Sequence, residues 1–258
     1  IILSCYSVIG GWLIKYIVSY ATTFSAPADF NAFIASPETI IWHLIFMLLT
    51  VAICFKGIGG IEKASKFMMP ALFVLLIVVV IRSVTLDGAS EGLRFIFEPN
   101  GGFTLSSINA ALGQVFYSLS LCMGITITYG SYLSKKENIV KSCGIVAGMD
   151  TTLAVFAGVA IFPAVFVFGL EPGQGAGLIF GTLPKVFGSM MGGSIFAIAF
   201  FVLVFFAAIT SSIALLEVVV SFTIDSWGWE RKKSVILVGI IEFLLGIPSA
   251  LSFGLLGD

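Results

Sequence analysis

Long apolar stretches constrain the fold of this chain more than any other feature of its sequence. Each is close to the roughly 20 residues that a helix needs to cross a bilayer. Hydrophobic residues make up 59% of the chain and charged residues 10%, whereas soluble domains carry about 25% charged residues. A water-soluble protein is therefore excluded. We predict an all-α integral membrane protein, one transmembrane core over residues 1–258, with seven spans at 1–20, 39–55, 65–86, 107–133, 140–169, 194–225 and 233–253.

Positive charge alternates along the connectors between these spans. Three connectors, counted with the adjoining start of the next helix, carry three lysines or arginines each: 56–66, 134–141 and 226–233. The alternating connectors carry none in 21–38, Arg94 in 87–106 with Arg82 just before it, and Lys185 in 170–193. Because cytoplasmic loops are enriched in Lys and Arg, we expect Ile1 to lie in the cytoplasm. The short connector 21–38 has no cysteine and no N-x-S/T site, which favours a bacterial plasma (inner) membrane.

Two connectors on the predicted outer side contain more than loop residues. Segment 170–193 has the apolar stretch Gly177–Phe180 followed by Leu183 and Pro184. Stretch 103–106 precedes the fourth span with turn and cap residues, which are Thr104, Ser106 and Ser107. We expect both connectors to fold back over the bundle as short helices.

Three carboxylates lie within apolar spans: Asp150, Glu217 and Glu242. Asp150 follows Lys141 by nine residues, which is about 13 Å at helical rise and therefore near mid-membrane. Ionisable residues at that depth usually mark a functional site. Asp150 is predicted to be a cation ligand or proton relay, with a hydrogen bond to a neighbouring helix as the alternative. Glu242 has no polar neighbours in the sequence and is predicted to be structural.

The sixth span places Ala207, Thr210 and Ser211 at positions i, i+3 and i+4, hence on one helix face. Helical side chains lean toward the N-terminus, so the two hydroxyls could converge with the Ala207 carbonyl. Such a group of neutral oxygens suits Na⁺. The alternative is ordinary hydroxyl-mediated helix packing.

The middle of the fourth span is polar on every face. We predict an unwound turn near Ser118–Gly124, because a break at membrane depth is tolerated where it lines a cavity. In the first span, Gly10 and Gly11 precede Trp12 and form a notch against which another helix can pack.

The remaining chemistry-bearing residues argue against other classes of protein. His43, the only histidine, is predicted to be an interfacial residue without a partner, so the chain is not expected to be an enzyme. A seven-helix receptor normally starts outside, whereas Ile1 is predicted inside. The net charge of −1 gives no sign of nucleic-acid binding. The four cysteines are expected to be buried thiols: Cys5, Cys54, Cys122 and Cys143.

Four motifs in order resemble the neurotransmitter:sodium symporter family. They are Lys56–Lys63 (the loop between the family's helices four and five), Gly113–Leu121 (its sixth helix), Gly177–Pro184 (its fourth extracellular loop) and Ala208–Ala214 (the sodium motif of its eighth helix). The resemblance implies a leucine-transporter-like inverted-repeat fold with a broken helix at about 107–133. The seven spans would be the family's third to ninth helices.

The resemblance also implies a function: sodium-coupled symport of an amino acid, apolar or aromatic, by alternating access. The expected partners are this solute, sodium ions and membrane lipid; nothing indicates an oligomeric state. A monoamine substrate and a non-transporting solute sensor on the same scaffold remain open. The family's first helix completes both sodium sites and its tenth supplies an outer gate, so this chain alone is expected to be inactive.

Site residues follow from the resemblance position by position. Those matching the substrate site are Tyr6, Tyr117, Ser118, Ser120, Met123, Ser212 and Leu215. Those matching the two sodium sites are Ser118 with Asp150, and Ala207 with Thr210 and Ser211. Tyr132 and Asp225 match the cytoplasmic gate. Asp150 stands where many members have asparagine, and a fixed carboxylate there implies chloride-independent transport.

Overall fold

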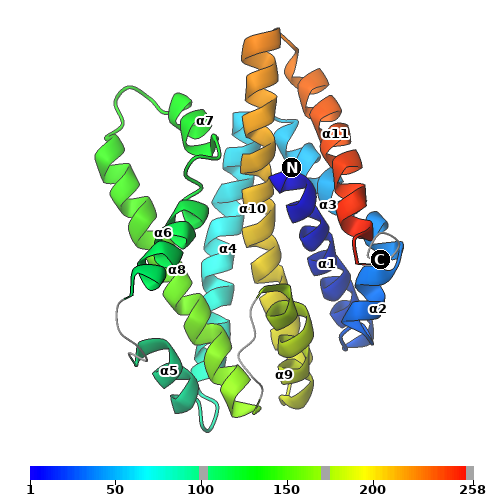
Figure 1. Cartoon of the computed structure of the whole chain (residues 1–258), viewed down its shortest axis with the longest axis vertical. Helices are drawn as coiled ribbons and strands as arrows, with labels where there is room; N and C mark the ends of the chain where they lie inside the picture. Colours follow the sequence, from blue (N-terminus) through cyan, green and yellow to red (C-terminus); the bar gives the residue numbers. More distant parts are fainter. Residues whose placement is uncertain (99–103, 170–174, 254–258) are drawn as a thin grey trace. The chain divides into compact units, whose positions relative to one another are not determined.

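The computed structural model describes residues 1–98, 104–169 and 175–253, and the elements in these ranges are helices (Figure 1). The chain divides into two compact units, Ile1–Leu75 with Gly173–Asp258, and Leu76–Pro172. Helix α4 (Ile58–Val84) contributes its first part to one unit and its last part to the other.

Four long helices make up most of the first unit: α1 (Ile2–Thr23), α3 (Glu38–Cys54), α10 (Gly193–Trp227) and α11 (Arg231–Leu251). Each of these four helices packs against the other three, and the most extensive packing is that of α1 on α10 and on α3. Three shorter elements complete it: α2 (Phe30–Ala35), the π-helix η1 (Gly177–Thr182) and α9 (Leu183–Ser189). Of these, α2 contacts α3, and α9 contacts both η1 and α10.

Two glycines of α1 allow α3 to approach closely. A Cβ atom on Gly10 would lie 2.5 Å from the Phe46 ring, and one on Gly11 would lie 2.6 Å from the backbone nitrogen of His43. The predicted small-residue notch is therefore confirmed, and α3 is the helix that fills it. His43 corrects the sequence prediction: it is fully buried, and its Nε2 atom is 2.9 Å from the Ser7 hydroxyl. The close approach of the two helices encloses the imidazole.

Aromatic side chains join α1 to the connector that precedes α10. The Tyr16 ring lies 5.1 Å from Phe180 and 4.9 Å from Phe201, measured between centroids. The Tyr16 hydroxyl donates a hydrogen bond of 2.8 Å to the Phe180 carbonyl oxygen. Segment 175–193 therefore folds back on the first unit as short helices, as expected, while 170–174 lies outside the described residues.

The second unit consists of α5 (Ser90–Phe97), α6 (Leu105–Ser118), α7 (Ile125–Ser131), α8 (Ile139–Val167) and the end of α4. Helix α5 packs on α8, where Gly92 lies against the backbone of Pro163. The predicted cap is confirmed, since the Thr104 hydroxyl accepts a hydrogen bond from the Ser107 amide. Residues 99–103 of this connector lie outside the described residues.

Helix α6 ends at Ser118 and α7 begins at Ile125, which confirms the predicted break. Ser120, Cys122 and Gly124 in the intervening turn have φ values of 54°, 64° and 78°. These values are left-handed, a region that non-glycine residues seldom adopt. The chain therefore cannot continue the α-helix here.

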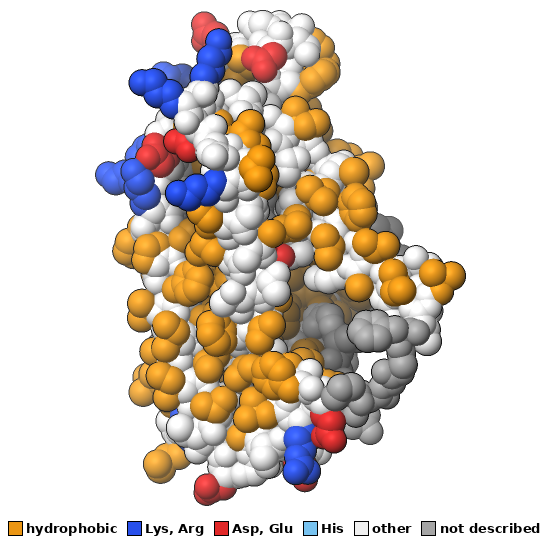
Figure 2. All heavy atoms as spheres, turned by 90° about the vertical axis from the view of Figure 1, so that its left-hand side faces the viewer, with side chains coloured by type: hydrophobic (Ala, Val, Ile, Leu, Met, Phe, Trp, Pro, Cys, Tyr) orange, Lys and Arg blue, Asp and Glu red, His pale blue; other side chains and the backbone are white. Residues whose placement is uncertain are grey.

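Five helices of the described residues are long and apolar enough to cross a membrane: α1, α4, α8, α10 and α11. Helix α3 is apolar but has 17 residues, and the broken pair α6 and α7 accounts for the remaining predicted span. Figure 2 shows hydrophobic side chains over much of the middle of one face, with most charged side chains toward its ends. This distribution suits a surface that faces lipid tails.

The structure corrects two further expectations. Three of the four free cysteines are exposed, and Cys54 alone of the four is buried. Apolar flanking sequence predicted burial, but on a membrane helix the same sequence also suits a surface facing lipid. The connector 21–38 contains helix α2, which was not predicted because it is much shorter than a membrane crossing; Asp29 caps it by accepting a hydrogen bond from the Asn31 amide. Helix α5, in contrast, is a short helix of the kind expected in connector 87–106.

We expect Gly11→Ala to destabilise the protein, because its added methyl group would meet α3 backbone, which cannot rotate away. Overpacking of this kind costs about 1–3 kcal/mol. Thermal melting of the detergent-solubilised protein measures the effect. Gly59→Ala is the matched control, since a Cβ atom there has nothing within 4 Å. Equal melting temperatures for the two variants would contradict the close approach.

Candidate functional site

The break between α6 and α7 brings a hydroxyl to a carboxylate. Ser118, the last residue of α6, has its hydroxyl oxygen 2.7 Å from each of the two carboxylate oxygens of Asp150 in α8. Both side chains are partly buried. One hydroxyl proton is thus shared between two carboxylate oxygens, and three oxygen atoms from two helices lie together. Such a group can hold a cation once the hydroxyl turns its lone pairs toward it.

The unwound turn supplies polar backbone beside this pair. The Leu121 amide donates to the Phe116 carbonyl and the Ser120 amide to the Tyr117 carbonyl, so the regular i to i−4 pattern stops after Leu119. Ser120 and Cys122 hold positive φ angles, at a cost of order 1–3 kcal/mol each. Strain of this kind concentrates at functional sites. The turn therefore marks this end of α6 as a candidate binding site.

A second group of oxygens lies within α10, in the first unit. The Thr210 hydroxyl donates to the carbonyl oxygens of Ala207 and Phe206, at 3.0 Å each, and the Ser211 hydroxyl donates to Ala207 at 3.2 Å. The predicted convergence of these oxygens is therefore present. In these contacts both hydroxyls donate to carbonyl oxygens of their own helix.

The other predicted site residues are placed as follows. Tyr117 is 58% exposed, next to Ser118. Ser212 is fully buried, and its hydroxyl has no hydrogen-bond partner in the described structure. Ser120, Met123, Leu215 and Tyr6 are all partly buried. Tyr132 follows α7, with its ring 6.2 Å from that of Tyr129, and Asp225 is exposed near the end of α10.

The predicted residues are shared between the two units. Tyr6, Ala207, Thr210, Ser211, Ser212, Leu215 and Asp225 belong to the first, and Tyr117, Ser118, Ser120, Met123, Tyr132 and Asp150 to the second. Within its own unit, each predicted sodium-ligand set is assembled. The set in the second unit combines the Ser118 hydroxyl with the Asp150 carboxylate. The set in the first unit combines two hydroxyls with the Ala207 carbonyl.

Glu217 has a partner that the sequence analysis did not find. Its carboxylate is fully buried, and it accepts hydrogen bonds of 2.9 and 2.6 Å from the two terminal nitrogens of Arg231. Arg231 also donates to the carbonyl oxygen of Cys54, at 2.8 Å from Nη2 and 3.2 Å from Nε. One guanidinium therefore connects the end of α3, the interior of α10 and the start of α11.

This pair gives Glu217 a structural role. Two features of the sequence point to this pair: Glu217 lies in an apolar run, and Arg231 follows it by 14 positions, after a turn at Gly228. Glu242 is also buried, with 8% of its surface exposed, and its Oε2 atom has no hydrogen-bond partner in the described residues.

Arg231→Met should destabilise the protein more than Glu217→Gln. Arg231→Met leaves the buried Glu217 carboxylate without its counter-charge, at a cost of about 3 kcal/mol. Glu217→Gln leaves the Arg231 guanidinium, which is partly exposed and can be reached by water. Thermal melting of both single variants and the double variant measures the coupling between them. Lys233→Met, at a neighbouring exposed position, is the control. Additive effects in the double variant would contradict a direct pair.

Comparisons with known proteins agree with this geometry. The family model described as "Sodium:neurotransmitter symporter family" matches residues 13–256. The sodium-dependent transporter YhdH of Bacillus subtilis is 42% identical over 268 residues, which are 100% of this chain and 59% of YhdH. A sodium-dependent transporter of Haemophilus influenzae is 41% identical over 265 residues, covering 97% of this chain and 58% of that protein.

A solved structure gives the fold. The crystal structure of MhsT in complex with L-phenylalanine superposes with a TM-score of 0.89 and is 46% identical, covering 100% of this chain and 61% of MhsT. The predicted fold class, an all-α integral membrane protein with a partial leucine-transporter-like inverted-repeat fold, is confirmed. The chain spans about three fifths of the length of these relatives.

Proposed function

The chain belongs to the sodium:neurotransmitter symporter family, and we propose that it forms part of the core of a sodium-coupled amino-acid symporter. The Bacillus subtilis and Haemophilus influenzae relatives are both named as sodium-dependent transporters. The observation that carries the proposal is the hydrogen-bonded pair of Ser118 and Asp150 at the α6 break. Because the chain spans only part of its relatives, the experiments below use the full-length protein.

Sodium and solute are coupled at Ser118 in this proposal. Its hydroxyl belongs to the predicted sodium set together with Asp150, and it also lies beside Tyr117 and Ser120 in the predicted solute set. An ion bound to the carboxylate would orient the Ser118 oxygen and fix the end of α6 where the solute binds. A carboxylate 4 Å from Na⁺ contributes about 4 kcal/mol at an effective dielectric constant near 20. The ion gradient then supplies the free energy for solute accumulation.

The second sodium ion is assigned to Ala207, Thr210 and Ser211. These oxygens carry no net charge, so the ion's positive charge is balanced by carbonyl and hydroxyl dipoles alone. Binding requires both hydroxyls to turn their protons away from the Ala207 carbonyl, where they now point. Such a site is weak in isolation, which allows the ion to be released when the concentration outside the site falls. Further ligands to both ions would come from the family's first helix.

The proposed solute is an apolar or aromatic amino acid. Two things support this choice: the related MhsT was crystallised with L-phenylalanine, and Tyr117 and Met123 beside the break offer an aromatic ring and a thioether. A monoamine is the alternative solute. The proposed location is the bacterial inner membrane with Ile1 in the cytoplasm, since Lys and Arg are concentrated in the connectors assigned to that side.

We expect full-length protein in proteoliposomes to accumulate L-phenylalanine against its gradient when sodium is higher outside, and to stop when potassium replaces sodium. Thr210→Val and Ser211→Ala should each raise the sodium concentration for half-maximal uptake about tenfold, because each removes one ligand to a charge. Ser221→Ala is the control, since Ser221 also bonds its own α10 backbone, at Val218. Sodium-dependent binding without accumulation would identify a sensor instead.

Uptake should be independent of chloride, because the Asp150 carboxylate supplies the negative charge beside sodium. Replacing chloride with gluconate is expected to leave the initial rate unchanged. Asp150→Asn keeps the side chain's size but removes its charge, and should weaken sodium binding at least tenfold. Glu242→Gln, at a buried carboxylate of α11 outside the predicted site, is the control. A rate that collapses in gluconate would refute the role given to Asp150.

A further inference from the structure

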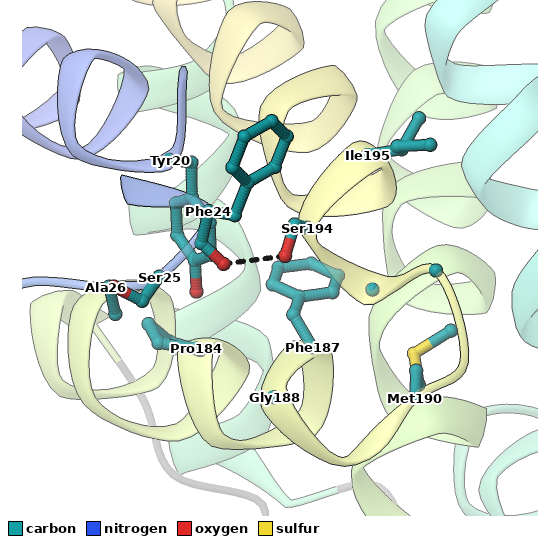
Figure 3. A pocket seen from close by; sticks show the side chains of 12 residues that line it. Tyr20, Phe24, Ser25, Ala26, Pro184, Phe187, Gly188, Met190, Ser194 and Ile195 are labelled. Atoms are coloured by element: carbon teal, nitrogen blue, oxygen red, sulfur yellow. Dashed lines mark hydrogen bonds between the residues drawn. The ribbon is translucent and has the colours of Figure 1, made fainter. Parts of the chain in front are cut away.

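A cavity of about 530 Å³ lies in the first unit, apart from all the predicted transport residues. It is bounded by the end of α1 with the residues after it, by α9, and by the start of α10 (Figure 3). Its principal side chains are Tyr20, Phe24, Pro184, Phe187, Met190 and Ile195. The volume falls within the roughly 300–1,000 Å³ typical of small-molecule sites.

Tyr20 places an unsatisfied polar group in this cavity. The side chain as a whole is 2% exposed, but its hydroxyl oxygen is not among the fully enclosed polar atoms, and no described residue forms a hydrogen bond with it. Buried tyrosine hydroxyls usually find a partner, as Tyr16 does one turn earlier on α1 by donating to Phe180. Figure 3 shows the Tyr20 side chain reaching from α1 toward Pro184, with its hydroxyl oxygen on the cavity side. The group is therefore free to bond an occupant.

The walls around Tyr20 are fixed by contacts on both sides. The Tyr20 ring stacks on Phe201 with centroids 5.8 Å apart. The Ser194 hydroxyl donates a 2.6 Å hydrogen bond to the Phe24 carbonyl, which ties the end of α1 to the start of α10. Phe24 itself ends α1 in a left-handed conformation, with φ of 54°. The cavity is thus formed before any occupant enters.

The lining decides the chemistry of that occupant. No Lys, Arg, Asp or Glu is among the 12 residues that line the cavity, and aromatic rings, a proline and a methionine thioether form much of its wall. A charged or zwitterionic molecule would lose its hydration without gaining a counter-charge. A neutral ring would pack against Phe24 and Phe187, and one polar group on it would reach the Tyr20 hydroxyl, which both donates and accepts.

We propose that this cavity binds a small neutral aromatic molecule with one hydrogen-bonding group, such as a phenol or an indole. The occupant differs from the proposed transported solute, since an amino acid is a zwitterion. Entry is from the side where Phe24 and Ile195 are 67% and 69% exposed. A bound ring would add contacts between α1, α9 and α10.

The test uses 4-fluorophenol, which is neutral at pH 7, and the full-length protein in lipid nanodiscs. Fluorine NMR measures saturable binding, with empty nanodiscs as the reference for partition into lipid. Wild type is expected to bind the phenol and not 4-fluorobenzoate, which has the same ring with a negative charge. Tyr20→Phe should bind about fivefold more weakly, because it loses one hydrogen bond while keeping the ring stack on Phe201.

A filling variant tests the cavity itself. Gly188 lines the cavity, and a Cβ atom there meets nothing within 4 Å, so Gly188→Leu adds a bulky side chain to this wall and should abolish binding. Ser189→Leu, on the same helix but outside the lining, should bind as wild type does. The proposal is overturned if wild type shows no saturable binding, as when lipid or another segment of the full-length protein fills the space. It is equally overturned if Tyr20→Phe and Gly188→Leu both bind like wild type.

Discussion

The need to satisfy every backbone polar group inside a bilayer governs this structure. Lipid offers no hydrogen bonds, so helices are the default and any break must be compensated by protein groups or by what the protein binds. The one break within a predicted span, between Ser118 and Ile125, occurs where Asp150 accepts the Ser118 hydroxyl and where two non-glycine residues hold positive φ angles. Such strain is kept only where the surroundings determine it. The break and the carboxylate therefore depend on each other.

The first unit uses different means to hold its helices together. Glycines of α1 let α3 approach to backbone contact, and the resulting space encloses His43 with Ser7. Arg231 connects the end of α3, the interior of α10 and the start of α11, and its fork geometry satisfies a buried carboxylate and a carbonyl at once. Aromatic contacts from Tyr16 secure the connector before α10. Close packing, charge pairing and ring contacts thus act at separate places along α1, α3 and α10.

Sequence alone predicted the features that depend on local pattern. Apolar length indicated the spans, Thr104 indicated a cap, and the ring of polar residues around Gly124 indicated the break. It did not predict features that depend on a distant partner. His43 is buried because two glycines lie 32 and 33 positions earlier on another helix, and nothing near His43 reveals this. Likewise, Glu217 could not be paired with Arg231 without knowing how α10 turns into α11. The exposed cysteines were misplaced because apolar neighbours in a membrane protein do not distinguish lipid from core.

Helix α10 relates these features to one another. It runs for 35 residues without a break, which is about 52 Å at helical rise and longer than the roughly 30 Å hydrocarbon layer. Along it lie Ser194 at the cavity, then Thr210 and Ser211 about 24 Å further on, then Glu217 bound to Arg231. If this unbroken helix tilts as one rigid body, a tilt that moves the hydroxyls of Thr210 and Ser211 also moves Ser194 at the cavity wall. The same tilt strains the ion pair of Glu217 with Arg231. The second unit differs, because its break lets α6 and α7 move separately. In the proposed mechanism, ion binding at Ser118 would therefore be a local event, whereas ion binding at Thr210 would act on the whole length of α10.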